Sequence, residues 1–137
     1  MTRPGGAAAR VDQAVGAGRR ERGQATVEFA LVIPIVVLLL AALVQVGLVV
    51  RDRVALVRIT AASARAAMVE PSDAVVADEL RALGGSLDIE SWNLSGARSP
   101  GALLTVAVTA RPTRVPLVGV AVSGMRITER LTVRVEG

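Results

Sequence analysis

Side chains that could carry out acid–base or nucleophilic chemistry are few in this chain. The sequence has no histidine and no cysteine, and its 16 basic residues are all arginine. It therefore lacks the commonest general base and metal ligand, the thiolate nucleophile and the lysine of a serine–lysine pair. Two carboxylate pairs remain, Asp78 with Glu79 and Asp88 with Glu90, and both are predicted to be solvated charges. No catalytic residue, cofactor, metal site or small-molecule substrate is predicted.

A more informative pattern stands at the start of an apolar segment. Residues 19–22 are Arg-Arg-Glu-Arg, Gly23 follows, and a lone carboxylate, Glu28, directly precedes Phe29 and a long uncharged run. A carboxylate costs about 2.5–3.5 kcal/mol at mid-bilayer on insertion scales, and less at the membrane edge. Taken alone, Glu28 is most simply a charge at a helix end that reaches the interface.

The element that positions these residues is the apolar run over residues 29–50, which Glu28 and Arg51 bracket. As a helix the run would extend about 33 Å, at about 1.5 Å per residue, which matches a hydrocarbon core about 30 Å thick. Pro34 inside the run predicts a kink of the kind that membrane helices tolerate. A cleaved secretory signal is disfavoured, because the run is too long and no Ala-x-Ala site closes it. The sequence thus predicts a transmembrane helix over residues 24–50.

The flanks of this helix differ in character. Residues 1–23 are rich in Gly, Ala and Arg without apolar periodicity, and are predicted to be a disordered basic leader. Residues 51–70 are predicted to continue the helix outside the membrane, and Pro71 to end it. Three- and four-residue steps indicate one apolar face on this continuation, formed by Val54, Val57, Ala61, Ala64 and Met68.

Residues 71–137 are predicted to form a small α+β domain outside the membrane. A short helix at about 73–83 would be capped by Ser72 or Asp73 and ended by Gly84 in a left-handed conformation. Alternating patterns predict strands from Leu87 onward, over 104–109 and over 125–135. A change of phase before Trp92 predicts either a bulge in the first strand or an early end of that strand. In the last strand, Glu129 is the one charge on the side that is otherwise apolar.

The fold class is therefore α+β. One long N-terminal transmembrane helix continues into a domain with a short helix and an antiparallel sheet of about three strands. Between the last two strands lies an apolar loop, Val115 to Val122, too short for a second span. Two alternatives stay open for it: a loop folded onto the sheet, or an exposed tip that meets a partner or the membrane.

The distribution of charge bears on partners and on topology. The net charge is +4, but the arginines are spread along the chain without an aromatic platform, which argues against a nucleic-acid partner. The local group of arginines beside the apolar run favours a lipid bilayer. The positive-inside rule gives no orientation, because within about 20 residues of the run each flank has four arginines: Arg10, Arg19, Arg20 and Arg22 on one side, and Arg51, Arg53, Arg58 and Arg65 on the other.

Residues 22–34, Arg-Gly-Gln-Ala-Thr-Val-Glu-Phe-Ala-Leu-Val-Ile-Pro, resemble the processing segment of type IV pilins and pseudopilins. Within that group the chain resembles the TadE family of the tight-adherence (Flp) pilus system, also in its C-terminal Thr-Glu-Arg-Leu-Thr-Val-Arg-Val-Glu. The resemblance implies cleavage after Gly23 by a prepilin peptidase, so that Gln24 becomes the first mature residue and Glu28 the fifth. Phe29 stands where major Flp pilins usually have tyrosine, which favours a minor pseudopilin.

The resemblance also implies a role and a location. The role is assembly of a tight-adherence pilus, or secretion through a related machine, by helix packing, with Glu28 of one subunit neutralising the new amine of its neighbour. The implied partners are the prepilin peptidase, other pilins or pseudopilins and the inner-membrane assembly platform. The implied location is the cytoplasmic membrane, with the N-terminus in the cytoplasm and the domain of residues 71–137 extracytoplasmic. A pilin-like fold and incorporation in a pilus are further implications.

Two other classes of function compete with this one. The main alternative is an uncleaved single-pass binding module of the cell envelope that uses its sheet and the apolar loop. A membrane-anchored hydrolase that depends on Asp88 or Glu90 is disfavoured, because the supporting side chains are missing.

Overall fold

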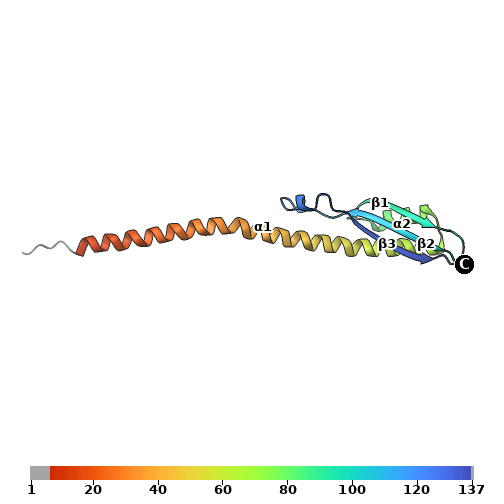
Figure 1. Ribbon diagram of the computed structural model, residues 1–137, viewed down its shortest axis with the longest axis horizontal. Coiled ribbons are helices and arrows are strands. Elements are labelled where there is room, and N and C mark those ends of the chain that lie inside the picture. Colours follow the sequence, from red (N-terminus) through yellow and green to blue (C-terminus); the bar gives the residue numbers. More distant parts are fainter. Residues whose placement is uncertain (1–6, 137) are drawn as a thin grey trace, which may run out of the picture. The chain divides into compact units, whose positions relative to one another are not determined.

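The computed structural model describes residues 7–136, and their side chains from residue 26 onward. The order of elements is helix α1 (Ala7–Val69), helix α2 (Asp73–Leu83), strands β1 (Asp88–Gly96) and β2 (Leu103–Arg111), the short 3-10 helix η1 (Gly119–Val122) and strand β3 (Ile127–Arg134) (Figure 1). The predicted α+β class is confirmed: a long helix is followed by a short one and a three-stranded antiparallel sheet. The chain divides into two units, Met1–Leu40 and Ala41–Gly137.

Helix α1 contains the candidate membrane span. It continues through Pro34, and its Thr26–Val69 part includes a window of mean hydropathy 2.9 in which no residue is buried. Leu31 and Ile35, for example, are each 66% exposed. Apolar surface left in water costs about 25 cal/mol per Å². This segment is long and apolar enough to cross a membrane, and it is the single candidate span among the described residues.

The start of α1 differs from the prediction for the leader. The helix begins at Ala7, so residues 7–23 are helical instead of lacking regular structure. The physical reason is that Ala, Arg, Gln and Glu, which dominate this stretch, are among the strongest helix formers, and that extending an existing helix is easier than starting one. Residues 1–6 of the predicted leader lie outside the described residues.

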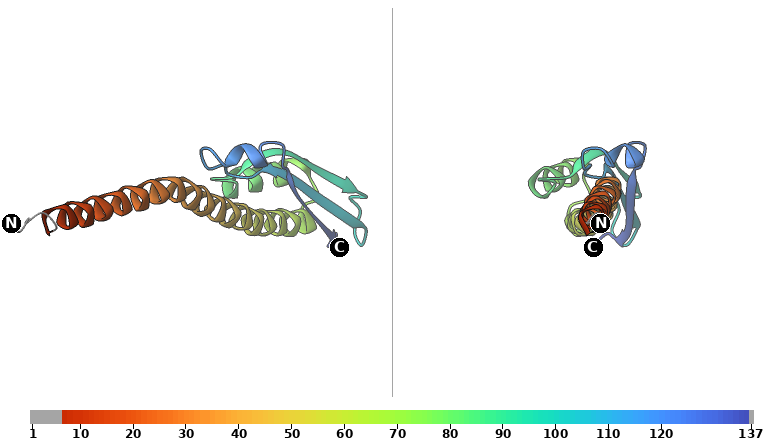
Figure 2. Two further views of the ribbon diagram at one scale, coloured as in Figure 1. Left: turned by 60° about the vertical axis from the view of Figure 1, so that its left-hand side comes forward. Right: turned by 90° about the vertical axis from the view of Figure 1, so that its left-hand side faces the viewer.

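The core of the second unit lies between the helices and one face of the sheet. Figure 2 shows the last part of α1 and α2 together on that face. The buried apolar side chains come from α1, α2, β2 and the chain after β3: Leu56, Ile59, Ala64, Ala67, Val76, Leu80, Leu104, Val106, Val108, Ala110 and Val135. The alternation predicted for β2 is therefore confirmed, because its inward residues all belong to this core.

The predicted apolar face of the α1 continuation is wrong in part. Val54 and Val57 are each 46% exposed, whereas Leu56 and Ile59 are buried. Apolar residues occur on two faces of this helix, and periodicity alone does not choose between them. The buried face also carries the polar residues Asp52, Thr60 and Ser63, which made it resemble a solvated face in the sequence.

Two hydroxyls in this core have no hydrogen-bond partner in the described structure, Thr60 Oγ1 and Ser63 Oγ. A buried polar group without a partner costs roughly 1–3 kcal/mol. We therefore expect Ser63→Ala, and separately Thr60→Val, to raise the free energy of unfolding by about 1 kcal/mol. Chemical unfolding of the detergent-solubilised chain measures this, with Ser91→Ala on the exposed side of β1 as the neutral control. A loss of stability in both variants would contradict the assignment.

Helix α2 begins as predicted and ends differently. The Ser72 hydroxyl accepts a hydrogen bond from the Val75 N–H at 3.2 Å, which identifies Ser72 as the cap. Gly84 is right-handed, with φ −61°, and the left-handed residue is Gly85, with φ +31°. Gly84 is nevertheless required by space, because a Cβ there would collide with the Leu80 carbonyl and come within 3.0 Å of Ile89.

The sheet has the order β1-β2-β3 with antiparallel pairing throughout. The register of β1 against β2 shifts between Ile89 and Ser91, so the predicted bulge is confirmed and contains Glu90. Two threonine pairs line the face away from the helices, with Thr105 and Thr132 hydroxyl oxygens 2.8 Å apart and those of Thr109 and Thr128 3.0 Å apart. This face is the polar one, as the alternation of β3 predicts.

Candidate functional site

The residues predicted for processing and assembly all lie in α1. Gly23 and Gln24 are within the helix. Glu28 is exposed, and Phe29 is 69% exposed. A peptidase must unwind the helix around the Gly23–Gln24 bond, and glycine lowers the cost of doing so, since it is about 1 kcal/mol less favourable than alanine inside a helix. The cleavage itself stays a prediction.

A second set of residues, which the sequence did not single out, joins α1 to the connection between β2 and β3. Gln45 is the one polar side chain in the apolar run, and it is only 5% exposed. Its Nε2 donates a hydrogen bond to the Thr113 carbonyl at 2.8 Å, and its Oε1 accepts one from the Val115 N–H at 2.7 Å. The Gln45 amide therefore pairs with the loop backbone as a neighbouring strand would.

Asp52 completes this contact two helical turns further along. It is 2% exposed, and its Oδ2 accepts a hydrogen bond from the Thr113 N–H at 2.6 Å. Residues seven apart share a face of a helix, so Gln45 and Asp52 together hold both backbone groups of Thr113. We refer to these two side chains as the Gln45–Asp52 clamp. Two features of the sequence could have indicated this clamp: Gln45 is the one amide in the apolar run, and Asp52 lies between Arg51 and Arg53.

The base of the same connection is held by Glu90. Arg126 donates to Glu90 Oε2 at 2.7 Å, and Arg111 donates to Oε1 at 3.0 Å. These bonds, with that of Arg126 the stronger cause, lower the pKa of Glu90 from 4.5 to about 2. The sequence predicted Glu90 to be a solvated charge without a partner, and this prediction is wrong. Glu90 instead links Arg111, the last residue of β2, to Arg126, the residue before β3. Glu129 pairs with Arg53 of α1 at 3.2 Å, which explains a carboxylate on the dry side of β3.

This pairing predicts a pH dependence of stability. Because the pKa of Glu90 is lowered in the folded state, its stabilising contribution is present above about pH 4.5 and is lost as the pH falls towards 2. We expect the stability difference between the parent and Glu90→Gln to shrink over this interval. Thermal unfolding of both proteins at a series of pH values measures it, with Asp88→Asn as the control. A difference that is the same at pH 3 and pH 7 would contradict the pairing.

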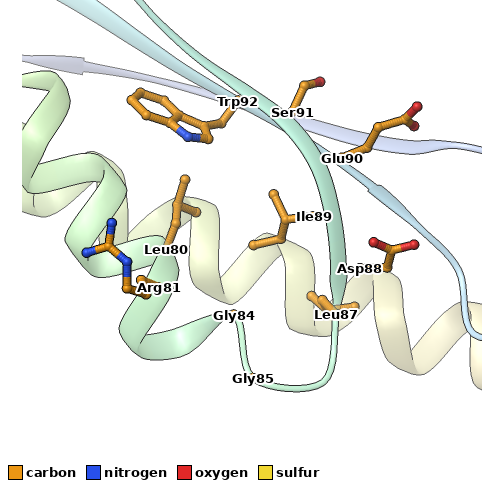
Figure 3. Close-up of a pocket in the computed structure, with 10 residues that line it drawn as sticks. All are labelled: Leu80, Arg81, Gly84, Gly85, Leu87, Asp88, Ile89, Glu90, Ser91 and Trp92. Atoms are coloured by element: carbon orange, nitrogen blue, oxygen red, sulfur yellow. The ribbon is translucent and has the colours of Figure 1, made fainter.

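An open groove lies between the end of α2 and β1. Leu80, Ile89 and Trp92 face each other across it, while Asp88 and Glu90 point to the opposite side of β1 (Figure 3). The carboxylate pair considered for hydrolysis is thus directed away from the groove. Among the described residues no group of three histidine, cysteine or acidic side chains could hold a metal ion.

Comparison with known protein families gives one match, and it lies in the N-terminal helix. The model of a family described as TadE-like protein matches residues 23–65. The match begins at Gly23 and covers the apolar run, Gln45 and Asp52, and it confirms the resemblance indicated by the sequence. Comparisons with curated proteins and with solved structures gave no significant match. The match covers 43 of the 137 residues, all of them in α1.

Proposed function

We propose that this chain, which carries the TadE-like helix, is a minor pseudopilin-like protein of a tight-adherence (Flp-type) pilus or a related secretion machine. The observation that carries the proposal is the unburied apolar surface of α1 inside the family-matched segment. Such a surface is suited to helix packing within a membrane. The protein would cross the cytoplasmic membrane once, with its N-terminus in the cytoplasm and residues 71–137 outside.

The proposed maturation step is hydrolysis of the Gly23–Gln24 peptide bond by a prepilin peptidase. This would remove the arginine-rich leader and leave the Gln24 amine four residues from Glu28. In a bundle of such helices, Glu28 of one subunit would pair with the amine of its neighbour, because each charge is costly alone in apolar surroundings. Other pilins or pseudopilins and the inner-membrane platform would be the partners.

The N-terminal sequence of the mature protein, taken from membranes of the native host, tests this proposal. We expect a chain that begins at Gln24, and we expect Gly23→Leu to retain the leader. Gly47→Ala is the matched control, because a Cβ at Gly47 meets no atom within 4 Å and the residue lies far from the cleavage point.

A parent chain that keeps the residues before Gly23 would favour the second candidate, an uncleaved membrane-anchored binding module of the envelope. The observation on its side is the open groove beside Trp92, which is lined by apolar, polar and charged residues of α2, β1 and the turn between them.

A further inference from the structure

The apolar loop, Val115 to Val122, projects its largest side chains outward. Leu117 is 80% exposed and Val120 is 76% exposed. Figures 1 and 2 show this segment, with η1, extending past the end of the sheet and alongside α1. We propose that the apolar loop enters the interface of the bilayer that α1 spans and forms a second contact with lipid. The proposal rests on the proposed membrane span, but not on cleavage or on pilus assembly.

The depth of the loop follows from its hydrogen bonds to α1. Gln45, which binds Thr113 and Val115, lies five residues before Val50, the last residue of the apolar run. At about 1.5 Å per residue, Gln45 lies about 8 Å inside the end of that run. Asp52, which accepts from the Thr113 N–H, lies just beyond that end, so the loop backbone passes from the end of the run at Thr113 towards the level of Gln45 at Val115. Both partners belong to the unit Ala41–Gly137. If lipid surrounds α1 up to Val50, it also reaches the loop.

The side chains of the loop fit this location. Residues 115–122, Val-Pro-Leu-Val-Gly-Val-Ala-Val, contain no charge and no polar side chain. Arg114 stands directly before them, and its guanidinium donates a hydrogen bond to the Ser123 carbonyl at 3.2 Å, across the neck of the loop. An arginine at this level is placed to meet anionic lipid headgroups, which attract arginine at the membrane surface. The loop is thus apolar at its tip and cationic at its neck.

The backbone of the loop is also suited to apolar surroundings. An unpaired N–H group costs several kcal/mol in hydrocarbon, so irregular backbone normally stays out of the membrane. Here Pro112 and Pro116 have no N–H group, and the N–H groups of Thr113 and Val115 donate to the Gln45–Asp52 clamp. Further N–H groups donate to carbonyls within the loop, namely those of Val118, Gly119, Ala121, Ser123 and Met125. Leu117 adopts φ +73°, which is uncommon for a residue with a Cβ, and its side chain is exposed.

Lipid is favoured over a protein partner by this placement. A protein would have to dock beside α1 at the level of the apolar run, where it would compete with the lipid that already surrounds the helix. Lipid needs no specific surface and fits any apolar tip of this kind. The test below also distinguishes lipid from a second copy of the chain or another protein that covers the loop.

Site-directed spin labelling tests the proposal, and the absence of native cysteine makes single labels unambiguous. Full-length Leu117→Cys and Val120→Cys would be labelled with a nitroxide and reconstituted in vesicles of phosphatidylethanolamine and phosphatidylglycerol. Leu103→Cys is the matched control, because Leu103 is also an exposed leucine, at 61%, on β2. Leu38→Cys reports on the span itself. Equal unfolding midpoints for the four variants would show that the fold is retained.

The expected result is several-fold more collision with oxygen than with a water-soluble nickel chelate at positions 117, 120 and 38, and the reverse at 103. Labels at 117 and 120 that are as accessible to nickel as the label at 103 would overturn the proposal, while the lipid signal at 38 would leave the span intact. Labels at 117 and 120 shielded from both reagents would also overturn it, because a protein would then cover the loop. A water signal at 38 would reject the span, and the proposal with it.

Discussion

Glu28→Gln is expected to abolish assembly while leaving the protein folded and in the membrane. Glu28 is exposed on α1 at the start of the apolar run, outside the packed unit that begins at Ala41. In the proposed bundle it neutralises the amine of a neighbouring Gln24. Removing one partner of a buried ion pair costs about 3–5 kcal/mol, because the other charge stays behind unpaired. At about 1.4 kcal/mol for each factor of ten, subunit association should fall at least about a hundredfold.

Complementation of a strain that lacks the protein measures this effect, with pilus-dependent adherence or secretion as the readout. The amount of variant in the membrane and its N-terminal sequence must match those of the parent, so that a failure of insertion or cleavage is recognised. Glu70→Gln is the matched control, since Glu70 is an exposed glutamate directly after α1. Normal adherence with Glu28→Gln would rule out the charge-pair mechanism even if cleavage after Gly23 occurs.

Elements with a strong local signal could be predicted from the sequence. The length of the apolar run and its lack of charge were enough to predict that helix. The Ser72 cap and the spacing of Val76 and Leu80 were enough to predict α2. The bulge in β1 was predictable because Ile89 and Trp92 fall on the same face only if one residue is inserted between them. In each case the information lies within a few neighbouring residues.

Features that depend on contacts between distant segments could not be predicted in this way. The choice between two apolar faces of α1 depends on α2 and the sheet, so Leu56 is buried where Val57 was expected. Glu90 resembled a solvated charge because its partners, Arg111 and Arg126, are more than twenty residues away. Of the candidate site, the pattern around Gly23 and Glu28 was visible in the sequence, whereas the Gln45–Asp52 clamp was not, because its acceptor and donor groups belong to the backbone of a distant loop.

Gln45→Ala should release the loop more completely than any other single change in the described structure. It leaves the Thr113 carbonyl and the Val115 N–H without their partner. These hydrogen bonds are partly buried. An orphaned group costs roughly 1–3 kcal/mol where it is buried, and more where lipid excludes water. Asp52→Ala removes one partner, that of the Thr113 N–H, and should have about half the effect. The strands should persist, because Glu90 still ties Arg111 to Arg126.

Limited trypsin digestion in detergent micelles measures this release, since Arg114 lies within the clamped segment. We expect the parent to resist cleavage after Arg114, Gln45→Ala to be cut rapidly there, and Asp52→Ala to be intermediate. Asn93→Ala, which removes an exposed amide from β1, should behave as the parent. If Gln45→Ala were cut no faster than Asn93→Ala, the loop would be held by its own packing, and the depth inferred for it from Gln45 would lose its support. Rapid cleavage of Gln45→Ala would explain why a polar amide is present in a membrane helix, where it is costly. Both hydrogen-bonding atoms of the Gln45 amide would then serve to hold this one loop.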